Sequence, residues 1–456
     1  MSAWRKELKE TLQLGVPMAF AQISHTLMGA TDVALVGRLQ GESLAAMAVG
    51  QAAYGLLLSL GMGIVAAVGP LVSQAHGAGN KPVIARTVAV GVGCSFLLSL
   101  LFWPLLYGSD LLFYHLDYPP EMRELATGYC RAVMWGLPFA FLFLVQKNYL
   151  DSISRPRWPM VCSLLGILVN GLADYAFMYG RFGFPELGVA GTGLATSAVN
   201  GFMALALIPM VWNSEFVQAL WRQKRQDWKE FLEIGVPIAG SIGIEVVLFV
   251  VGALMMGKLG SDEAGAHQIV LTCAATTFMV PLGVSFAGTT RVGQAVGRRD
   301  FAAVRPAGVA AITVGTCFMV LTAGLFLLWP DFFVELFWEP GLEKSPKVGV
   351  FAAELLVIAG FFQIADGIQV TSIGALRGPK DVNIPLLVAI FSYWFVGMGS
   401  ASYMTFYTSL RHRGLWLGFL LGLITAALIL GVRFLLLSTR LTHDEELQKA
   451  ASAEAT

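Results

Sequence analysis

The sequence predicts an all-α membrane protein with twelve transmembrane helices in two six-helix lobes. Three observations support this class. The chain has 456 residues, of which 56% are hydrophobic and only 13% are charged, whereas charged residues make up about a quarter of a typical soluble domain. Its apolar residues gather in stretches of about 20 residues or more, the length that a helix needs to cross a bilayer. An internal repeat relates the first half of the chain to the second.

Hydropathy and length place the spans. The amino terminus is short and basic, and the apolar stretch behind it superficially resembles a secretory signal. That stretch is too long for a signal, contains Asp32 and is followed by no cleavage pattern, so we expect it to remain as the first span. The twelve predicted spans are 14–37, 47–74, 86–108, 126–146, 159–180, 188–213, 232–257, 266–290, 306–329, 348–374, 382–407 and 414–437.

The distribution of charge predicts the orientation. With the amino terminus in the cytoplasm, 21 of the 30 Lys and Arg residues fall on the cytoplasmic side, as the positive-inside rule requires. Two outer connections are acidic instead. Both termini are therefore predicted to be cytoplasmic. The acidic residues of the outer connections are Asp110, Asp117, Glu121 and Glu124, then Asp331, Glu335, Glu339 and Glu343.

The internal repeat sets the predicted domain organisation. At an offset of 220 residues, Gly15-Val16-Pro17 matches Gly235-Val236-Pro237, and 72–77 resembles 292–297. Each half holds an even number of spans, so both halves enter the membrane from the same side and the repeat axis runs along the membrane normal. The predicted parts are an amino-terminal lobe (1–213), a cytoplasmic connection (214–231), a carboxy-terminal lobe (232–438) and a cytoplasmic tail (439–456).

Four carboxylates interrupt the apolar stretches: Asp32, Asp174, Glu245 and Asp366. On insertion scales an Asp at the bilayer centre costs about 2.5 to 3.5 kcal/mol, so such groups normally face a bundle interior or a wet cavity. Glu245 lies near the middle of the seventh span, and Asp366 lies at a similar depth in the tenth. Two such carboxylates can hold a monovalent cation such as Na+ between them or share a proton.

The amino-terminal half offers a second acidic pair. Asp32 and Asp174 lie at matching depth in the outer halves of the first and fifth spans, and Asn170 is one turn before Asp174 on the same helical face. Thr192 or Thr196 of the sixth span could complete a polar cluster. For Asp174, a solvated position at the membrane interface is the alternative.

Aromatic residues accompany the carboxylates of the second half. Phe249 is one turn from Glu245 and Phe362 is one turn from Asp366, so each ring could offer its face to a cationic ligand. Packing in the core or against lipid is the alternative for both rings. His25, in the middle of the first span, either titrates near neutral pH or is a neutral side chain bonded to a carbonyl.

Other classes of function lack support in the sequence. Two six-helix bundles related by a repeat are a transporter architecture. No Gly-rich loop ends in Lys-Ser or Lys-Thr, so the energy for such transport must come from an ion gradient or a partner. The five cysteines are scattered through apolar stretches and indicate neither disulfides nor a metal centre. Net charge is zero, and we expect no nucleic-acid partner, no organic cofactor and no enzymatic activity.

Several motifs together resemble one known family. They are Asp32, Pro185-Glu186-Leu187-Gly188, Glu245 with Val246-Val247-Leu248-Phe249, Ala266-His267-Gln268, Arg291-Val292-Gly293, Asp366 and Leu376-Arg377-Gly378-Pro379-Lys380-Asp381. With these motifs, the chain resembles over almost its whole length the multidrug and toxic compound extrusion (MATE) transporters, in particular the bacterial NorM subfamily.

The resemblance implies the MATE fold and an antiporter of the bacterial inner membrane that expels cationic, amphipathic drugs and dyes in exchange for Na+ or H+. It implies a carboxy-lobe cation site at Glu245 and Asp366, with Phe278 and Phe362 as neighbouring aromatics. Asp32, Asn170 and Asp174 resemble the amino-lobe site that is associated with proton coupling. Phe362 and Met28 stand where relatives have tyrosines, which leaves the coupling ion open. A monomer in the lipid bilayer is expected.

Two alternatives compete with this interpretation. A lipid-linked oligosaccharide flippase of the same superfamily needs basic residues in its cavity to hold pyrophosphate, whereas the ionisable groups inside these spans are mainly acidic. A membrane-embedded transferase needs catalytic groups gathered at one interface, whereas these acids are buried and divided between the two halves.

Overall fold

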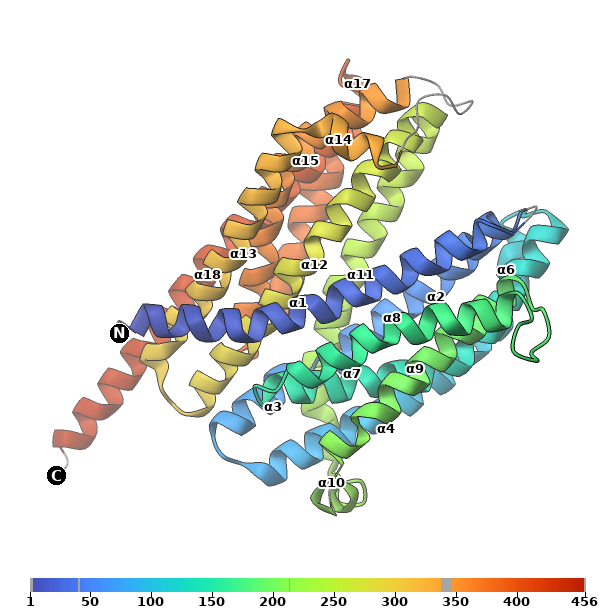
Figure 1. Ribbon diagram of the computed structural model, residues 1–456. Coiled ribbons are helices and arrows are strands. Elements are labelled where there is room, and N and C mark those ends of the chain that lie inside the picture. Colours follow the sequence, from blue (N-terminus) through green and yellow to red (C-terminus); the bar gives the residue numbers. More distant parts are fainter. Residues whose placement is uncertain (1–2, 40–41, 213, 338–346, 455–456) are drawn as a thin grey trace. The chain divides into compact units, whose positions relative to one another are not determined.

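The computed structural model describes residues 3–39, 42–212, 214–337 and 347–454. Every regular element in these ranges is a helix (Figure 1), which confirms the predicted all-α class. Contacts divide the chain into two compact units. The amino unit comprises Phe20–His76 and Asn80–Gly240, and the carboxy unit comprises Met1–Ala19, Gly77–Gly79 and Ser241–Thr456. The lobe boundaries expected from the sequence remain a prediction. Glu339 and Glu343 lie outside the described residues.

Most helices of the amino unit follow one another with short connections. The N-cap of α4 is Asn80, whose side chain accepts a hydrogen bond from the Val83 amide at 3.3 Å, as an N-cap residue does. Residues of α1 belong to both units. The elements are α1 (Ala3–Val36), α2 (Ser43–Val65), α3 (Val68–Gly77), α4 (Lys81–Tyr107), α5 (Ser109–His115), α6 (Pro120–Val133), η1 (Met134–Gly136), α7 (Leu137–Ser152), α8 (Arg157–Met178), α9 (Val189–Val211) and α10 (Ser214–Ala219).

The carboxy unit contains the longest helices and one unusual segment. Residues Ile390–Met398 form a π-helix, η2, that joins α16 to α17 within a single apolar span. π-helical turns are rare and often mark functional sites. Residues of α11 up to Gly240 belong to the amino unit, and the rest of this helix belongs to the carboxy unit. The elements are α11 (Arg225–Leu259), α12 (Ser261–Gly297), α13 (Phe301–Leu328), α14 (Pro330–Glu335), α15 (Lys347–Arg377), α16 (Asn383–Ala389), η2 (Ile390–Met398), α17 (Gly399–Tyr407) and α18 (His412–Glu454).

Each of the twelve predicted spans coincides with a helix or with consecutive helices, and for ten of them the helix or helices extend beyond the predicted span at one end or both. Among the described residues, eleven of the twelve are long and apolar enough to cross a membrane. The remaining one is α1, whose 34 residues include charged side chains in the first turns and His25, Thr31 and Asp32 further along. These polar residues lower its hydropathy.

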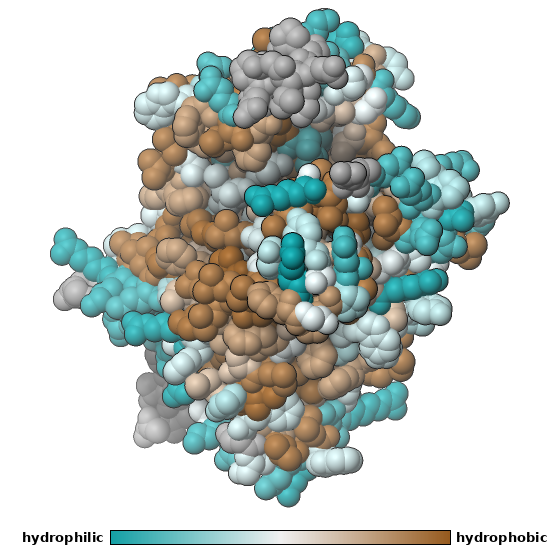
Figure 2. Space-filling model, turned by 45° about the vertical axis from the view of Figure 1, so that its right-hand side comes forward, coloured by the Kyte–Doolittle hydropathy of each residue, from teal (hydrophilic) through white to brown (hydrophobic). Residues whose placement is uncertain are grey.

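The outside of the molecule is suited to lipid. Figure 2 shows apolar side chains exposed over much of the visible face. Leu100, Leu168 and Leu321 each expose more than half of their surface, at 64%, 66% and 63%. In a membrane protein such side chains face acyl chains, which are as apolar as leucine. Four of the five cysteines are buried and all are free, in agreement with a packing role.

Small residues bring α18 against η2 and α17. A Cβ atom added at Gly418 would lie 2.4 Å from the Ala401 Cα atom, and one added at Gly422 would lie 2.9 Å from the Gly397 Cα atom. One added at Gly414 would lie 2.6 Å from the carbonyl carbon of Met404. Glycines at every fourth position let two membrane helices touch along their backbones.

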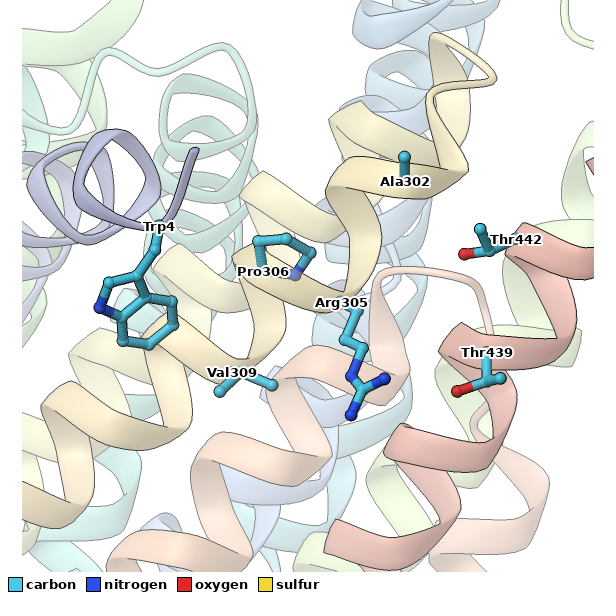
Figure 3. A pocket seen from close by; sticks show the side chains of 7 residues that line it. All are labelled: Trp4, Ala302, Arg305, Pro306, Val309, Thr439 and Thr442. Atoms are coloured by element: carbon cyan, nitrogen blue, oxygen red, sulfur yellow. The ribbon is translucent and has the colours of Figure 1, made fainter. Parts of the chain in front are cut away.

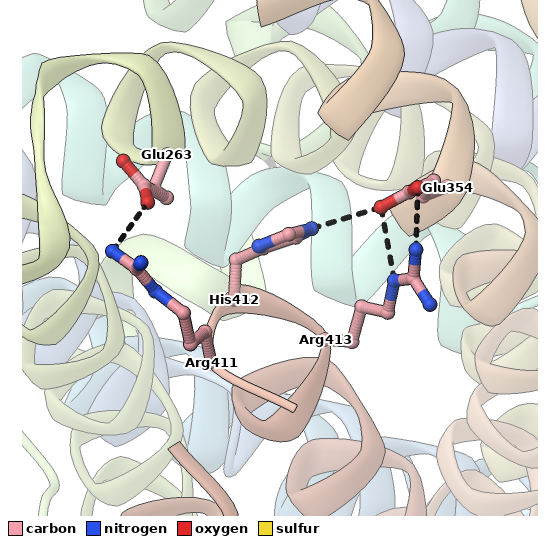
Figure 4. Close-up of polar contacts among 5 residues, drawn as sticks. All are labelled: Glu263, Glu354, Arg411, His412 and Arg413. Carbon is pink, nitrogen blue, oxygen red and sulfur yellow. Dashed lines mark hydrogen bonds and ion pairs between the residues drawn. The ribbon is translucent and has the colours of Figure 1, made fainter. Parts of the chain in front are cut away.

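Ion pairs join the ends of α12, α15 and α18 (Figure 4). The Glu354 carboxylate accepts from Arg413 Nε at 2.9 Å and lies 3.0 Å from His412 Nε2. Arg411 Nη2 lies 3.1 Å from a Glu263 oxygen. The Phe351 ring lies against the His412 ring, with 4.3 Å between centroids. The residues at the start of α18 are thereby held to α12 through Glu263 and to α15 through Glu354.

Candidate functional site

Three polar residues of the amino unit meet inside it. Asn170 Nδ2 donates to Asp32 Oδ1 at 3.0 Å and to Asp174 Oδ2 at 3.2 Å. The first acid comes from α1, and the other two residues lie one turn apart on α8. All three are buried, and Asp174 has no exposed surface. The structure therefore brings together the three residues of the predicted amino-lobe site, which we call the Asp32 cluster.

The two carboxyl groups of the Asp32 cluster lie close together, because both accept from the same Asn170 amide. Two nearby carboxylates cannot both stay ionised at low cost, so the pair favours binding of one proton or one cation. Asp174 Oδ1 and Asn170 Oδ1 are buried acceptors without a hydrogen-bond partner among the described residues. The cluster is equipped to hold a proton, and it has acceptor atoms left over for a cation.

A cavity of about 300 Å³ lies in the amino unit, with Asp32 and Asn170 in its wall. Its volume is at the lower end of the range for small-molecule pockets, which are mostly apolar with a few placed polar groups. No Lys or Arg contributes to the described lining. The lining comprises His25, Met28, Gly29, Asp32, Gln51, Tyr54, Gly55, Leu58, Tyr129, Asn170, Thr196, Val199, Asn200 and Met203.

Sequence reasoning missed part of this cavity. The hydroxyl of Tyr54 lies near the Asn200 side chain, and that of Tyr129 lies near Gln51. Each pair joins residues far apart in the chain, so spacing gave no sign of them; the only available signal was a polar residue in an apolar span. Of the two threonines considered, Thr196 lines the cavity.

The acids of the carboxy unit are arranged differently. Asp366 of α15 is 6% exposed and Glu245 of α11 is half-buried, and their charges interact. The charges of Glu245 and Arg377 also interact. Neither the Glu245 nor the Asp366 carboxylate forms a hydrogen bond with another described residue, so the interactions within this group are electrostatic. We call Glu245 and Asp366 the Glu245 pair, an open site in contrast to the Asp32 cluster.

Tyr393 lies within reach of the same charges. Its hydroxyl, on the π-helix η2, accepts a hydrogen bond from Gln369 Nε2 at 2.6 Å, and both Glu245 and Asp366 act on it electrostatically. Tyr393 is 2% exposed. The sequence analysis assigned no role to Tyr393 or Arg377, because the first depends on a π-turn and the second on a contact between distant helices.

The predicted aromatic residues occupy different surroundings. Phe362 is 3% exposed and lies 5.5 Å from Trp416 between ring centroids, so it belongs to the hydrophobic core. Phe249 is half-buried and packs edge-on against Phe419, at 5.7 Å. Phe278 of α12 is also half-buried, and its neighbour Thr277 accepts a hydrogen bond from Gln363 at 2.7 Å.

The described residues contain no group of three or more His, Cys, Asp or Glu side chains that could hold a metal ion. A Na+ ion at the Glu245 pair would thus have two carboxylates as its acidic ligands. Oxygen atoms from carbonyls, hydroxyls or water would have to supply the remaining ligands, since hard cations take oxygen donors. The Tyr393 hydroxyl is such a donor.

Comparisons with known proteins agree with this architecture. The chain is 37% identical to "Probable multidrug resistance protein NorM" of Bradyrhizobium diazoefficiens, over 95% of this chain and 94% of that protein. It is 35% identical to the protein of the same name from Agrobacterium fabrum, over 96% of each chain. A solved structure described as the "Outward-facing conformation of a multidrug resistance MATE family transporter of the MOP superfamily" matches with a TM-score of 0.87 at 21% identity, covering 96% of this chain and 97% of that one.

The structural match confirms the predicted fold. The model of the MatE family matches residues 17–176 and 237–403, two segments that fall in the two halves of the internal repeat. Together with the identities to the NorM proteins, this match confirms the resemblance seen in the sequence. The chain is a multi-pass membrane protein, and it belongs to the MatE family.

Proposed function

We propose that this protein is a secondary antiporter that exports cationic, amphipathic drugs and dyes in exchange for H+ or Na+. The observation that carries the proposal is the Asp32 cluster in the wall of a cavity without Lys or Arg in its described lining. A buried negative charge in a low-dielectric wall attracts cations. The similarity to proteins named for multidrug resistance supports the same function.

The exchange rests on competition for the carboxylates. An incoming ion and an outgoing organic cation cannot both neutralise the same charge, so binding of one favours release of the other. A ligand shifts a conformational equilibrium only by its different affinity for the two states. In this proposal, the Asp32 cluster and the Glu245 pair supply that difference as the transporter alternates between the two sides of the bacterial inner membrane.

Cargo of the opposite charge fits the cavity poorly. A lipid-linked pyrophosphate needs cationic donors such as the Arg fork, and the described lining of the amino-unit cavity offers Asp32 instead. The flippase alternative is therefore disfavoured. The acids are also divided between two clusters, which does not suit a transferase active site.

Transport by purified protein in liposomes tests the proposal. When a pH or Na+ gradient is imposed, ethidium and a zwitterionic fluoroquinolone should be transported in the direction opposite to the flow of the ion. An anionic dye should not be transported. Asp32→Asn should abolish the gradient-driven movement, and Glu121→Gln, which neutralises an exposed acid of an outer connection, should leave it unchanged. Equal transport of ethidium and the anionic dye would contradict the proposal. Comparison of the two gradients identifies the coupling ion.

A further inference from the structure

A second cavity, of about 460 Å³, lies in the carboxy unit (Figure 3). Trp4 near the start of α1, Arg305 and Val309 of α13, and Thr439 and Thr442 of α18 line it. Figure 3 shows the Arg305 side chain extending from α13 between Val309 and Thr439. This cavity shares no lining residue with the cavity beside Asp32.

Arg305 is the group in this cavity that can bind an anion. It is exposed and forms no ion pair with another described residue. The two threonine hydroxyls already donate to carbonyls of their own helix, Thr439 to Leu435 at 2.9 Å and Thr442 to Ser438 at 3.0 Å. The guanidinium offers N–H donors in a planar fork that matches two oxygens of a phosphate group.

Apart from the two threonines, the rest of the cavity lining is apolar, and the cavity lies where a lipid headgroup would be. On α18 the apolar run ends at Leu435-Leu436-Leu437, and polar residues follow from Ser438. That change marks the level at which the hydrocarbon core gives way to headgroups. Trp4 is 38% exposed, and tryptophan is enriched at this level because its ring is apolar and its N–H is polar. Val309 adds a second apolar wall.

We propose that this cavity binds one anionic phospholipid, with the phosphate on Arg305 and the glycerol and first acyl carbons against Trp4 and Val309. Basic pockets between transmembrane helices are known to receive anionic lipid headgroups. A soluble anion would gain nothing from the apolar walls, and a membrane-embedded surface is always in contact with lipid. The site is independent of the proposed transport function and of both carboxylate sites.

Quenching of tryptophan fluorescence tests the site. The full-length protein is reconstituted in phosphatidylcholine bilayers that contain an equal mole fraction of either brominated phosphatidylglycerol or brominated phosphatidylcholine. The chain has 11 tryptophans, so the difference between the unmodified protein and Trp4→Phe isolates the Trp4 signal. At Trp4 we expect brominated phosphatidylglycerol to be preferred over brominated phosphatidylcholine by about fivefold, because one arginine near an anionic headgroup strengthens binding by about this factor.

Substitutions then assign the preference to Arg305. Arg305→Gln should abolish it, Arg305→Lys should retain most of it, and Arg440→Gln should leave it unchanged. Arg440 is the matched control because it is an exposed arginine of α18 outside the cavity lining. Equal quenching by the two lipids, or a preference that survives in Arg305→Gln, would overturn the proposal. Displacement of the lipid by inorganic phosphate alone would assign the site to a soluble anion and would likewise overturn it.

Discussion

Asn170 joins two acids that would otherwise repel each other. Its single Nδ2 group has two hydrogens, and the distances of 3.0 Å to Asp32 and 3.2 Å to Asp174 indicate that each carboxylate accepts one of them. Hydrogen bonds to charged groups contribute about 1.5 to 3 kcal/mol each. The amide thus fixes the separation of the carboxylates, and the separation determines which ion fits between them.

We therefore expect Asn170→Leu to change the affinity for the coupling ion by about tenfold or more, because at least one charge-assisted hydrogen bond is lost and tenfold corresponds to about 1.4 kcal/mol. Binding of H+ should become tighter, since the ionised carboxylates lose a donor that stabilises them. Binding of Na+ should become weaker, since the separation of the two carboxylates is no longer fixed. The concentration of H+ or Na+ that half-maximally stimulates ethidium efflux in liposomes measures this affinity. Thr196→Val is the control, since Thr196 lines the same cavity but donates its hydroxyl to the Thr192 carbonyl at 3.0 Å. An unchanged half-maximal concentration in Asn170→Leu would exclude a role for the amide.

Glu245→Gln and Asp366→Asn should each abolish gradient-driven efflux while the protein remains inserted. A neutral amide is cheaper to bury than a carboxylate, so a loss of transport cannot be ascribed to a loss of folding. Efflux is measured at matched expression, with circular dichroism as the check on folding. If both variants kept full efflux, the coupling role would pass to the Asp32 cluster alone.

The sequence predicted the acids of both sites but not their surroundings. Asn170 and Asp174 were identifiable because they lie one turn apart on one helix, and Asp32 because an acid in an apolar span is costly. Tyr54 and Tyr129 could not be found in this way, since the polar side chains near them, Asn200 and Gln51, lie on other helices. Contacts between distant helices depend on helix packing, which periodicity alone does not determine.

At the level of elements, α18 depends on glycine for its approach to α17. A Cβ atom added at Gly418 would be 2.4 Å from Ala401 Cα. Two non-bonded carbon atoms cannot lie this close together. Backbone has to move to admit even one methyl group, and overpacking of this kind typically costs 1 to 3 kcal/mol.

Gly418→Ala should therefore lower the midpoint of thermal unfolding in detergent. Gly324→Ala on α13 is the matched control, because an added Cβ there meets no heavy atom within 4 Å. The same substitution in a helix interior otherwise favours alanine by about 1 kcal/mol, so the control should be neutral or stabilising. A Gly418→Ala variant that is as stable as the control would mean that α18 is free to shift.

The π-helix is the element that the sequence did not predict. Hydropathy identified 382–407 as one apolar span, and the span is present, but Ile390–Met398 departs from α-helical hydrogen bonding within it. A π-turn changes the number of residues per turn without changing composition, so no apolar pattern records it. The π-helix carries Tyr393, whose hydroxyl accepts a hydrogen bond from Gln369 and lies close enough to the Glu245 pair to interact with its charges.

At the scale of the whole molecule, orientation in the membrane is the untested expectation. The excess of Lys and Arg predicts that both termini and the connection 214–231 are cytoplasmic. A cysteine at Arg225 should then react with an impermeant thiol reagent only from the inside, and a cysteine at Glu121 only from the outside. Both positions are exposed. The opposite labelling pattern would invert the topology.

This experiment needs one change to the background. Cys317 is the exposed cysteine of the chain, and the other four are buried. Cys317→Ala therefore removes the native thiol with the greatest access to the reagent, and the protein without an added cysteine serves as the blank.

If the coupling ion is a proton shared by the Asp32 cluster, the proposed exchange has a consequence for the membrane potential. Two carboxyl groups that share one proton carry one net negative charge, and replacing that proton by a monovalent organic cation leaves the charge of the cluster unchanged. In the proposed exchange of one proton for one ethidium ion, no net charge crosses the bilayer, so voltage gives no driving force and only the pH difference does. A zwitterionic drug reverses this result, because each exchanged proton then moves one charge inward and gains about 2.3 kcal/mol per 100 mV.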